Sequence, residues 1–234
     1  MAELEKYMRS FIVAAIVLCG LLFFASYAQA AQTADPAANA VQKHYAGLKS
    51  MRAEFTQVLT HQESGAVENR AGVLYFATPL NVRWETERPI PEVLLITPEA
   101  IWNAFPDEDM AYKYPANLSE DSGAIVRVVT GQSNLDKDFI IENKGTKEGI
   151  TTLLLYPQNP TQSMTEAELV VEAKTGVIKQ VTIVDFFNNR NAITFTAQEI
   201  NPEMDDNLFT FTPAKGMKVE DRTQDGSLTK PLMQ

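Results

Sequence analysis

Apolar and polar residues alternate with a period of two along much of this chain, and that alternation limits the possible folds more than any other feature. The stretch from Gly72 to Thr86 reads as two strands joined at Thr78-Pro79. On the second strand Val82 and Trp84 share one face and Arg83 takes the other, because side chains alternate along a strand. Four further segments are apolar on one face: Leu74 with Phe76, Val181 with Ile183, Ile193 with Phe195, and Phe209 with Phe211. The pattern predicts a sheet with one apolar face.

About eleven short strands fit the pattern, the last of them at Phe209–Thr212. Two stretches look helical instead. The first is Val41–Ser50, which follows an Ala-rich leader at Thr33–Ala40. The second lies within Asn117–Gly131, where Ile125, Val128 and Val129 recur at helical spacing. This order predicts an incomplete antiparallel β-barrel with short helices on one side.

The N-terminus reads as a secretory signal peptide. Lys6 and Arg9 precede an apolar run of about fifteen residues, which Ala28-Gln29-Ala30 follows as a small-x-small cleavage signal. An uncleaved anchor is the alternative, but the run is shorter than the roughly 20 apolar residues that a membrane span needs. We therefore expect residues 1–30 to be removed near Ala30/Ala31 on export to the periplasm. Residues 31–234 then form a single domain with a core of about 41–221.

Composition excludes several partners and cofactors. The formal net charge is −10 and no run of Lys or Arg occurs, so nucleic acid and anionic membrane surfaces are poor partners. The single cysteine, Cys19, lies in the signal peptide, so the mature chain is expected to have no disulfide and no cysteine-bound metal. We expect a soluble monomer.

Catalytic chemistry has little support in the sequence. His44 and His61 lack obvious partners, and the nucleophile, zinc-binding and phosphate-binding motifs are absent. Asp107-Glu108-Asp109 has carboxylates but not the ligand spacing of a calcium loop, so a hydrated acidic turn is expected there. An acid–base carboxylate pair stays open from sequence alone. Binding is the favoured class of function, with no metal and no cofactor.

The apolar face of the sheet has two interpretations. Its side chains either fill a sealed core or line a cavity. If the chain makes one curved sheet, only two short helices remain to cover that face, which favours a hydrophobic cleft between sheet and helices.

Three segments are the most specific in this chain: Phe55-Thr56-Gln57, Pro79 to Trp84, and the closing Phe-x-Phe-x-Pro-x-x-Gly. Their order and spacing resemble those of the periplasmic outer-membrane lipoprotein carrier proteins, the LolA-type family, and the resemblance covers nearly all of Val41–Asp221. It implies an incomplete antiparallel barrel with a helical lid over a cavity for lipoprotein acyl chains. The expected cavity residues are Phe55, Leu74, Phe76, Val82, Trp84, Ile193 and Phe195, and the expected lid residues are Ile125, Val128 and Val129.

One position departs from the family pattern. Many of these carriers have an Arg just before the proline that corresponds to Pro79, where it latches the lid, and this chain has Thr78. A neutral hydroxyl makes a hydrogen bond roughly half as strong as a charged one, so the latch is weaker or comes from another residue.

The resemblance also implies function and partners. It predicts a periplasmic chaperone that takes lipoproteins from an inner-membrane ATP-driven exporter towards the outer membrane, and it leaves open a separate outer-membrane receptor. The alternative is a sensory or regulatory lipid-binding domain on the same half-barrel. An enzyme acting on lipids is disfavoured, because no nucleophile–base pair stands out in the sequence.

Overall fold

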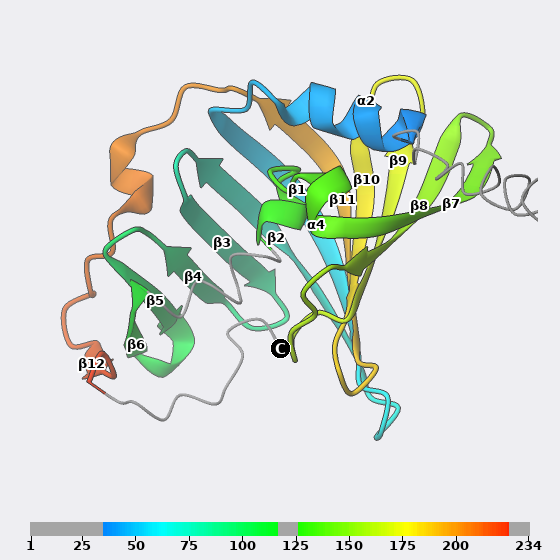
Figure 1. The fold of residues 1–234 in the computed structure, drawn as a ribbon. Helices are drawn as coiled ribbons and strands as arrows, with labels where there is room; N and C mark the ends of the chain where they lie inside the picture. Colours follow the sequence, from blue (N-terminus) through cyan, green and yellow to red (C-terminus); the bar gives the residue numbers. More distant parts are fainter. Residues whose placement is uncertain (1–34, 117–125, 225–234) are drawn as a thin grey trace, which may run out of the picture. The chain divides into compact units, whose positions relative to one another are not determined.

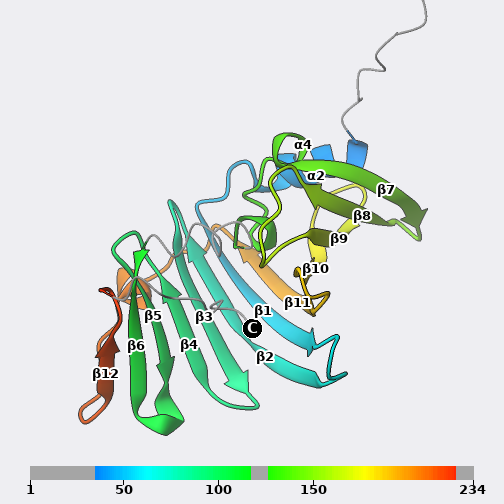
Figure 2. The same ribbon diagram turned by 60° about the horizontal axis from the view of Figure 1, so that its bottom comes forward.

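The computed structural model describes residues 35–116 and 126–224, and these lie in one compact unit that begins at Asp35. One curved sheet of twelve strands dominates it (Figure 1, Figure 2). The strands are β1 Ser50–Thr60, β2 Val67–Ala77, β3 Asn81–Arg88, β4 Glu92–Ile96, β5 Ala100–Phe105, β6 Met110–Pro115, β7 Phe139–Lys147, β8 Ile150–Pro157, β9 Glu166–Glu172, β10 Ile178–Val184, β11 Arg190–Ile200 and β12 Lys218–Asp221.

The sheet is open, with the order β12-β6-β5-β4-β3-β2-β1-β11-β10-β9-β8-β7. Neighbouring strands pair antiparallel except at one edge, where β12 runs parallel to β6. The predicted incomplete barrel is confirmed, with twelve strands where the sequence predicted about eleven, and with a parallel pair that the pattern did not reveal.

Alternation sets the two faces of the sheet, as the sequence predicted. On β3, Val82, Trp84 and Thr86 are buried, while Arg83 and Glu85 point the other way and are only partly covered. In the ladder, Trp84 lies opposite Leu74 on β2 and Leu94 on β4, so these buried side chains share the concave face. That face carries the apolar core of the described residues.

The first helix, α2, spans Pro36–Tyr45 and not the predicted Val41–Ser50. The Asp35 side chain caps it by accepting hydrogen bonds from the amides of Ala37 and Ala38, at 2.8 and 3.1 Å. Proline is tolerated in the first helical turn and alanine has the highest helix propensity, so the expected leader folds as helix instead. The helix packs on the concave side of the sheet, where Val41 and Tyr45 join the core (Figure 1).

Two further helical pieces lie on the same side. Residues 126–129 are helical, and α4 spans Leu135–Asp138. Val126, Val128, Val129 and Leu135 all belong to the core cluster, which fixes these pieces to the concave face. The helix expected within Asn117–Gly131 is therefore present at its C-terminal end, and residues 117–125 lie outside the described part of the chain.

The predicted strand at Phe209–Thr212 is wrong. A 3-10 turn, η4 (Asp206–Phe209), occupies its start, and the last strand is β12. The Phe211 ring stacks on Trp102 with centroids 4.7 Å apart, and Arg83 Nη1 donates to the Leu208 carbonyl at 3.3 Å. The alternation of apolar residues here serves packing against the convex face of β3 to β5, and the chain then reaches the far edge of the sheet (Figure 1).

Candidate functional site

The seven residues predicted to line a cavity lie together on the concave face. They come from four strands, and each is at least nine-tenths buried: Phe55 on β1, Leu74 and Phe76 on β2, Val82 and Trp84 on β3, and Ile193 and Phe195 on β11. We call this set the apolar wall. All seven belong to one cluster of buried apolar residues.

The centre of the apolar wall is a contact between two aromatic rings. The centroids of Phe55 and Trp84 lie 4.5 Å apart, although β2 separates their strands. Gly72 lies opposite Phe55 on β2 and has no side chain, which leaves room for the two rings to meet. A Cβ at Gly72 would lie 1.8 Å from the Glu85 carbonyl oxygen, so the close approach of β2 and β3 requires glycine there. Trp84 is only 5% exposed.

Residues 126–132, which we call the covering segment, pack into the same cluster as the apolar wall. Val128 and Val129, two of the predicted lid residues, are buried within it. The helical turn ends in a Schellman motif, in which Gln132 N–H donates to the Arg127 carbonyl and Gly131 N–H to the Val128 carbonyl. Ile125, the third predicted lid residue, lies outside the described residues.

Tyr45 holds the end of the covering segment. Gln132 Nε2 donates to the Tyr45 carbonyl at 3.3 Å, and a Cβ on Gly131 would lie 2.4 Å from the Tyr45 ring. The Tyr45 hydroxyl donates to Gln198 Oε1 at 3.0 Å and accepts from the Ile178 amide at 3.2 Å. Burial raises the pKa of Tyr45 to about 12, and the hydrogen bond from Ile178 opposes part of that rise.

Sequence reasoning did not identify these contacts. Glycine after a short apolar helical run is a recognised C-cap signal, so the position of Gly131 was accessible from sequence. Its contact with Tyr45 was not, because about eighty residues of chain separate the two.

Thr78 makes no side-chain latch among residues 35–116 and 126–224. Its side chain is exposed, and only its backbone amide is bonded, to the Lys49 carbonyl at 2.8 Å. Arg83 does not replace the missing arginine, because it points to the convex face, where it pairs with Glu85 and bonds Leu208.

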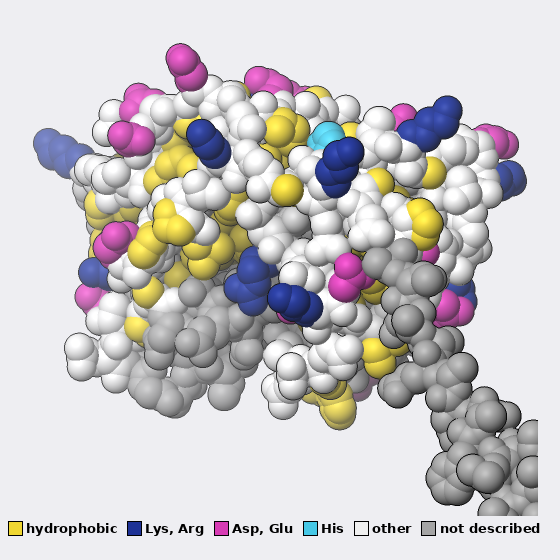
Figure 3. All heavy atoms as spheres, turned by 45° about the horizontal axis from the view of Figure 1, so that its top comes forward, with side chains coloured by type: hydrophobic (Ala, Val, Ile, Leu, Met, Phe, Trp, Pro, Cys, Tyr) yellow, Lys and Arg dark blue, Asp and Glu magenta, His cyan; other side chains and the backbone are white. Residues whose placement is uncertain are grey.

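A space-filling view shows where apolar side chains reach the surface. They gather in a hollowed region on the left of Figure 3, the side on which Figure 1 places β3 to β6, while charged side chains are scattered over the rest of the view. On the face seen in Figure 3, apolar side chains are therefore concentrated on one side.

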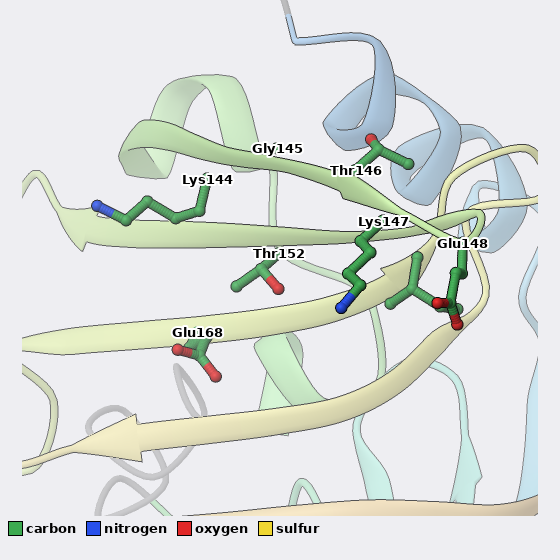
Figure 4. Close-up of a pocket in the computed structure, with 8 residues that line it drawn as sticks. Lys144, Gly145, Thr146, Lys147, Glu148, Thr152 and Glu168 are labelled. Atoms are coloured by element: carbon green, nitrogen blue, oxygen red, sulfur yellow. The ribbon is translucent and has the colours of Figure 1, made fainter.

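A second concavity lies on the other face of the sheet. It is an open groove of about 790 Å³ beside the β7–β8 turn, lined by Lys144, Lys147, Glu148, Thr152 and Glu168 among others (Figure 4). Thr152 and Glu168 alternate with the buried Leu153 and Leu169, so the groove is on the convex side. Its lining is polar with charges of both signs, which does not fit an acyl chain.

Metal-binding and membrane-spanning features are not found in the described part of the chain. Asp107 and Glu108 lie in a 3-10 turn, η2 (Pro106–Glu108), whose residues are not buried. No group of three or more His, Cys, Asp or Glu side chains in residues 35–116 and 126–224 is placed to hold a metal ion. Within the same residues no helix has the length and apolar character needed to cross a membrane.

Fold and site together define an open β half-barrel with an apolar concave face that helical pieces cover. The chain belongs to the outer membrane lipoprotein carrier protein LolA family, whose sequence profile matches residues 46–212. Its relatives include the outer-membrane lipoprotein carrier protein of Xanthomonas campestris pv. campestris, which is 27% identical over 174 residues, covering 74% of this chain and 82% of that protein.

Two further comparisons agree. The outer-membrane lipoprotein carrier protein of Cupriavidus taiwanensis is 26% identical over 209 residues, covering 87% of this chain and 97% of that protein. Among solved structures, an uncharacterized conserved protein from Thermus thermophilus is similar with a TM-score of 0.52 and 14% identity, over 82% of this chain and 100% of that one. At that identity the structural similarity supports the fold and not the function.

Proposed function

We propose that this protein is a periplasmic chaperone that binds the acyl chains of lipoproteins and carries them from the inner membrane to the outer membrane. The observation that carries the proposal is the apolar wall. It lies on the concave face of a half-barrel whose sequence matches the family, and short helical pieces, not a second sheet, share its buried cluster. The curated relatives are named for the same cargo. The function is binding and transport and not catalysis.

The proposal includes export and two kinds of partner. Residues 1–30 act as the signal peptide, and the mature chain begins near Ala31 as a single domain. An inner-membrane ATP-driven exporter supplies the lipoprotein, and a receptor at the outer membrane is a second candidate partner. No cofactor or metal takes part.

Energetics explains why a carrier needs a covered wall. A triacylated anchor has on the order of 45 methylenes, and burying each is worth ~0.8 kcal/mol, or ~36 kcal/mol in all. Non-covalent binding does not exceed ~20 kcal/mol, and a carrier that captured so much could not release its cargo. Part of the gain must be offset, and displacing packed side chains from the wall does this.

Val128 and Val129 are the side chains that we propose the lipid displaces. They are buried in the same core cluster as Trp84, so movement of the covering segment would withdraw two apolar side chains from that cluster. The segment has one helical turn, and its end is tied to the rest of the chain through Gly131 and Gln132 against Tyr45. We propose that these contacts hold the covering segment in place, as the arginine does in carriers that have it at the position of Thr78.

The direct test is release of lipoproteins from spheroplasts that contain a working exporter. Purified mature protein is added, and lipoproteins in the supernatant are counted by immunoblot, with an unrelated acidic periplasmic protein as the control. Carriage predicts release with this protein alone. Absence of release would contradict carriage and favour the sensory domain. Mass spectrometry of the bound material separates a carrier, which holds intact lipoprotein, from an enzyme, which holds altered lipid.

Amide exchange tests the covering segment separately. We expect residues 126–131 to exchange faster when lipoprotein is bound, because the Val128 and Val129 side chains leave the wall. The β8–β9 pair, on the other half of the sheet, is the internal control and should keep its protection. Equal exchange of residues 126–131 with and without cargo would show that the segment is a fixed part of the core.

A further inference from the structure

One polar side chain interrupts the apolar surface of β1. The inward-facing residues of this strand are Met51, Ala53, Phe55, Gln57 and Leu59, and Gln57 is only 3% exposed. Its Nε2 donates to Asn191 Oδ1 at 2.8 Å, but its carbonyl oxygen Oε1 is buried without a hydrogen-bond partner. A buried oxygen in this state destabilises the fold, because it has lost water without gaining a donor.

Gln57 marks a boundary on the concave face. One step along β1 towards the core, Phe55 lies opposite Phe195 in the apolar wall. Gln57 itself lies opposite Ile193 on β11 and opposite Arg70 on β2. Gln57 therefore has the apolar wall on its β11 side and a charged residue on its β2 side.

Arg70, the cross-strand neighbour of Gln57 on β2, does not satisfy the Gln57 oxygen. Arg70 Nε donates to Glu68 at 2.7 Å and its Nη1 to Glu92 at 3.5 Å. The hydrogen bond from Arg70 lowers the pKa of Glu68, which keeps that carboxylate charged and the arginine engaged. The unpaired oxygen thus belongs to a strand position opposite an arginine that is already engaged in ion pairs, next to the apolar wall.

Only some ligands offer this oxygen a partner. The methylenes of an acyl chain donate nothing, and an ester group has acceptors only. The N–H of an amide-linked acyl chain, which an N-acylated lipid anchor carries at its polar end, is a donor next to apolar chain. A ligand with that donor removes the penalty at Gln57, and one without it leaves the oxygen unpaired.

We propose that Gln57 Oε1 accepts a hydrogen bond from the amide N–H of an N-acylated lipid anchor. This places the polar junction of the anchor beside Arg70 and runs its chains along the apolar wall towards Trp84. The proposal rests on the proposed function, since it concerns the orientation and selection of the lipid bound there. Gln57 is a positioning and specificity residue in this account.

The test uses two probes that differ in one group. N-lauroylglycine methyl ester has the amide N–H, and its analogue with an ester oxygen in place of that N–H does not. Affinities of the mature protein for both are measured by displacement of a fluorescent fatty acid. We expect the amide to bind about fivefold more tightly to the wild type, as one added hydrogen bond implies. Gln57→Leu should bind both probes equally, with the affinity that the wild type shows for the ester.

A matched control is available on the opposite face. Gln180 lies on the convex side of β10, opposite Thr194, and is half-buried. Gln180→Leu should keep the fivefold preference. Urea melts of both variants test folding. Gln57→Leu removes the unpaired buried oxygen and also the hydrogen bond from Gln57 Nε2 to Asn191 Oδ1, so the two effects oppose each other and we expect the variant to stay folded in the absence of urea.

The outcomes distinguish the role of Gln57 from the proposed binding of acyl chains. Equal wild-type affinity for the two probes would overturn the role of Gln57 while leaving acyl binding intact. A preference for the amide that survives in Gln57→Leu would overturn the assignment to this residue. Failure to bind either probe would overturn both proposals. The wild-type comparison alone is decisive should Gln57→Leu fail to fold.

Discussion

Trp84→Ala is the most informative perturbation of the apolar wall. A tryptophan buries about 150–250 Å² of surface, and Trp84 is only 5% exposed. At ~25 cal/mol per Å² the lost burial is worth about 4–6 kcal/mol, and a compact unfolded state reduces this to about 3–5 kcal/mol. We therefore expect a loss of ~3–5 kcal/mol in unfolding free energy, in the range of other large-to-small core substitutions.

The chain contains a matched control, because it has only two tryptophans. Trp102 is half-buried on the convex face, where it stacks on Phe211. Trp102→Ala should cost about 2 kcal/mol, since less of its surface is buried. Urea melts followed by circular dichroism give both values.

The affinity for an acyl chain tests whether Trp84 contributes to binding, which the stability measurements alone do not show. Trp84→Ala should weaken the affinity for a fluorescent fatty acid at least about tenfold, or ~1.4 kcal/mol, while Trp102→Ala should leave it unchanged. Measurements are made below the urea transition of each variant, so that both are folded. An unchanged affinity in Trp84→Ala would refute the role of the apolar wall in lipid binding, and would mean that Trp84 belongs to a sealed core. A stability loss under about 1 kcal/mol would refute the packing calculated above.

Three further predictions follow from the contacts of α2 and the covering segment. Gly131→Ala should destabilise the protein by about 1–2 kcal/mol because of the positive φ at this position, and by more because of the clash with Tyr45. Amide exchange of residues 126–130 should accelerate, and unchanged exchange would contradict the contact between Gly131 and Tyr45. The raised pKa of Tyr45 contributes stability that is complete below pH 10 and is lost as pH rises towards 12, by about 3 kcal/mol in total. Tyr45→Phe should lack this slope in melts across that range. Asp35→Ala should cost about 1 kcal/mol in a thermal or urea melt, since it removes the cap of α2, and Asp35→Asn should recover most of the loss.

Sequence analysis located the strands well, because a half-buried strand carries its own signature. Val82, Trp84 and Thr86 are buried as alternation required, and all seven predicted wall residues lie on one face. The start of α2 was missed because Pro36 and the alanines after it were read as a leader, although a capping Asp and an early proline favour helix. Local patterns thus served where the deciding interactions are local.

Long-range packing decided the rest. Phe209 and Phe211 have the spacing of a strand, yet η4 ends at Phe209, and Phe211 stacks on Trp102, which is more than one hundred residues away in sequence. The parallel pairing of β12 with β6 leaves no periodic signal in either strand, so the pattern could not reveal it. The roles of the wall and lid residues in binding stay predictions.

The amino-acid sequence by itself determined that most of this chain forms strands with one apolar face, since period-two alternation follows directly from strand geometry. It also fixed the family, because segment order survives divergence. Only the tertiary structure decided what meets that face. Phe55 contacts Trp84 across a glycine, Tyr45 holds Gly131 and Gln132, and the oxygen of Gln57 is buried without a partner. Each of these depends on segments far apart in sequence coming together, and no local pattern encodes that meeting.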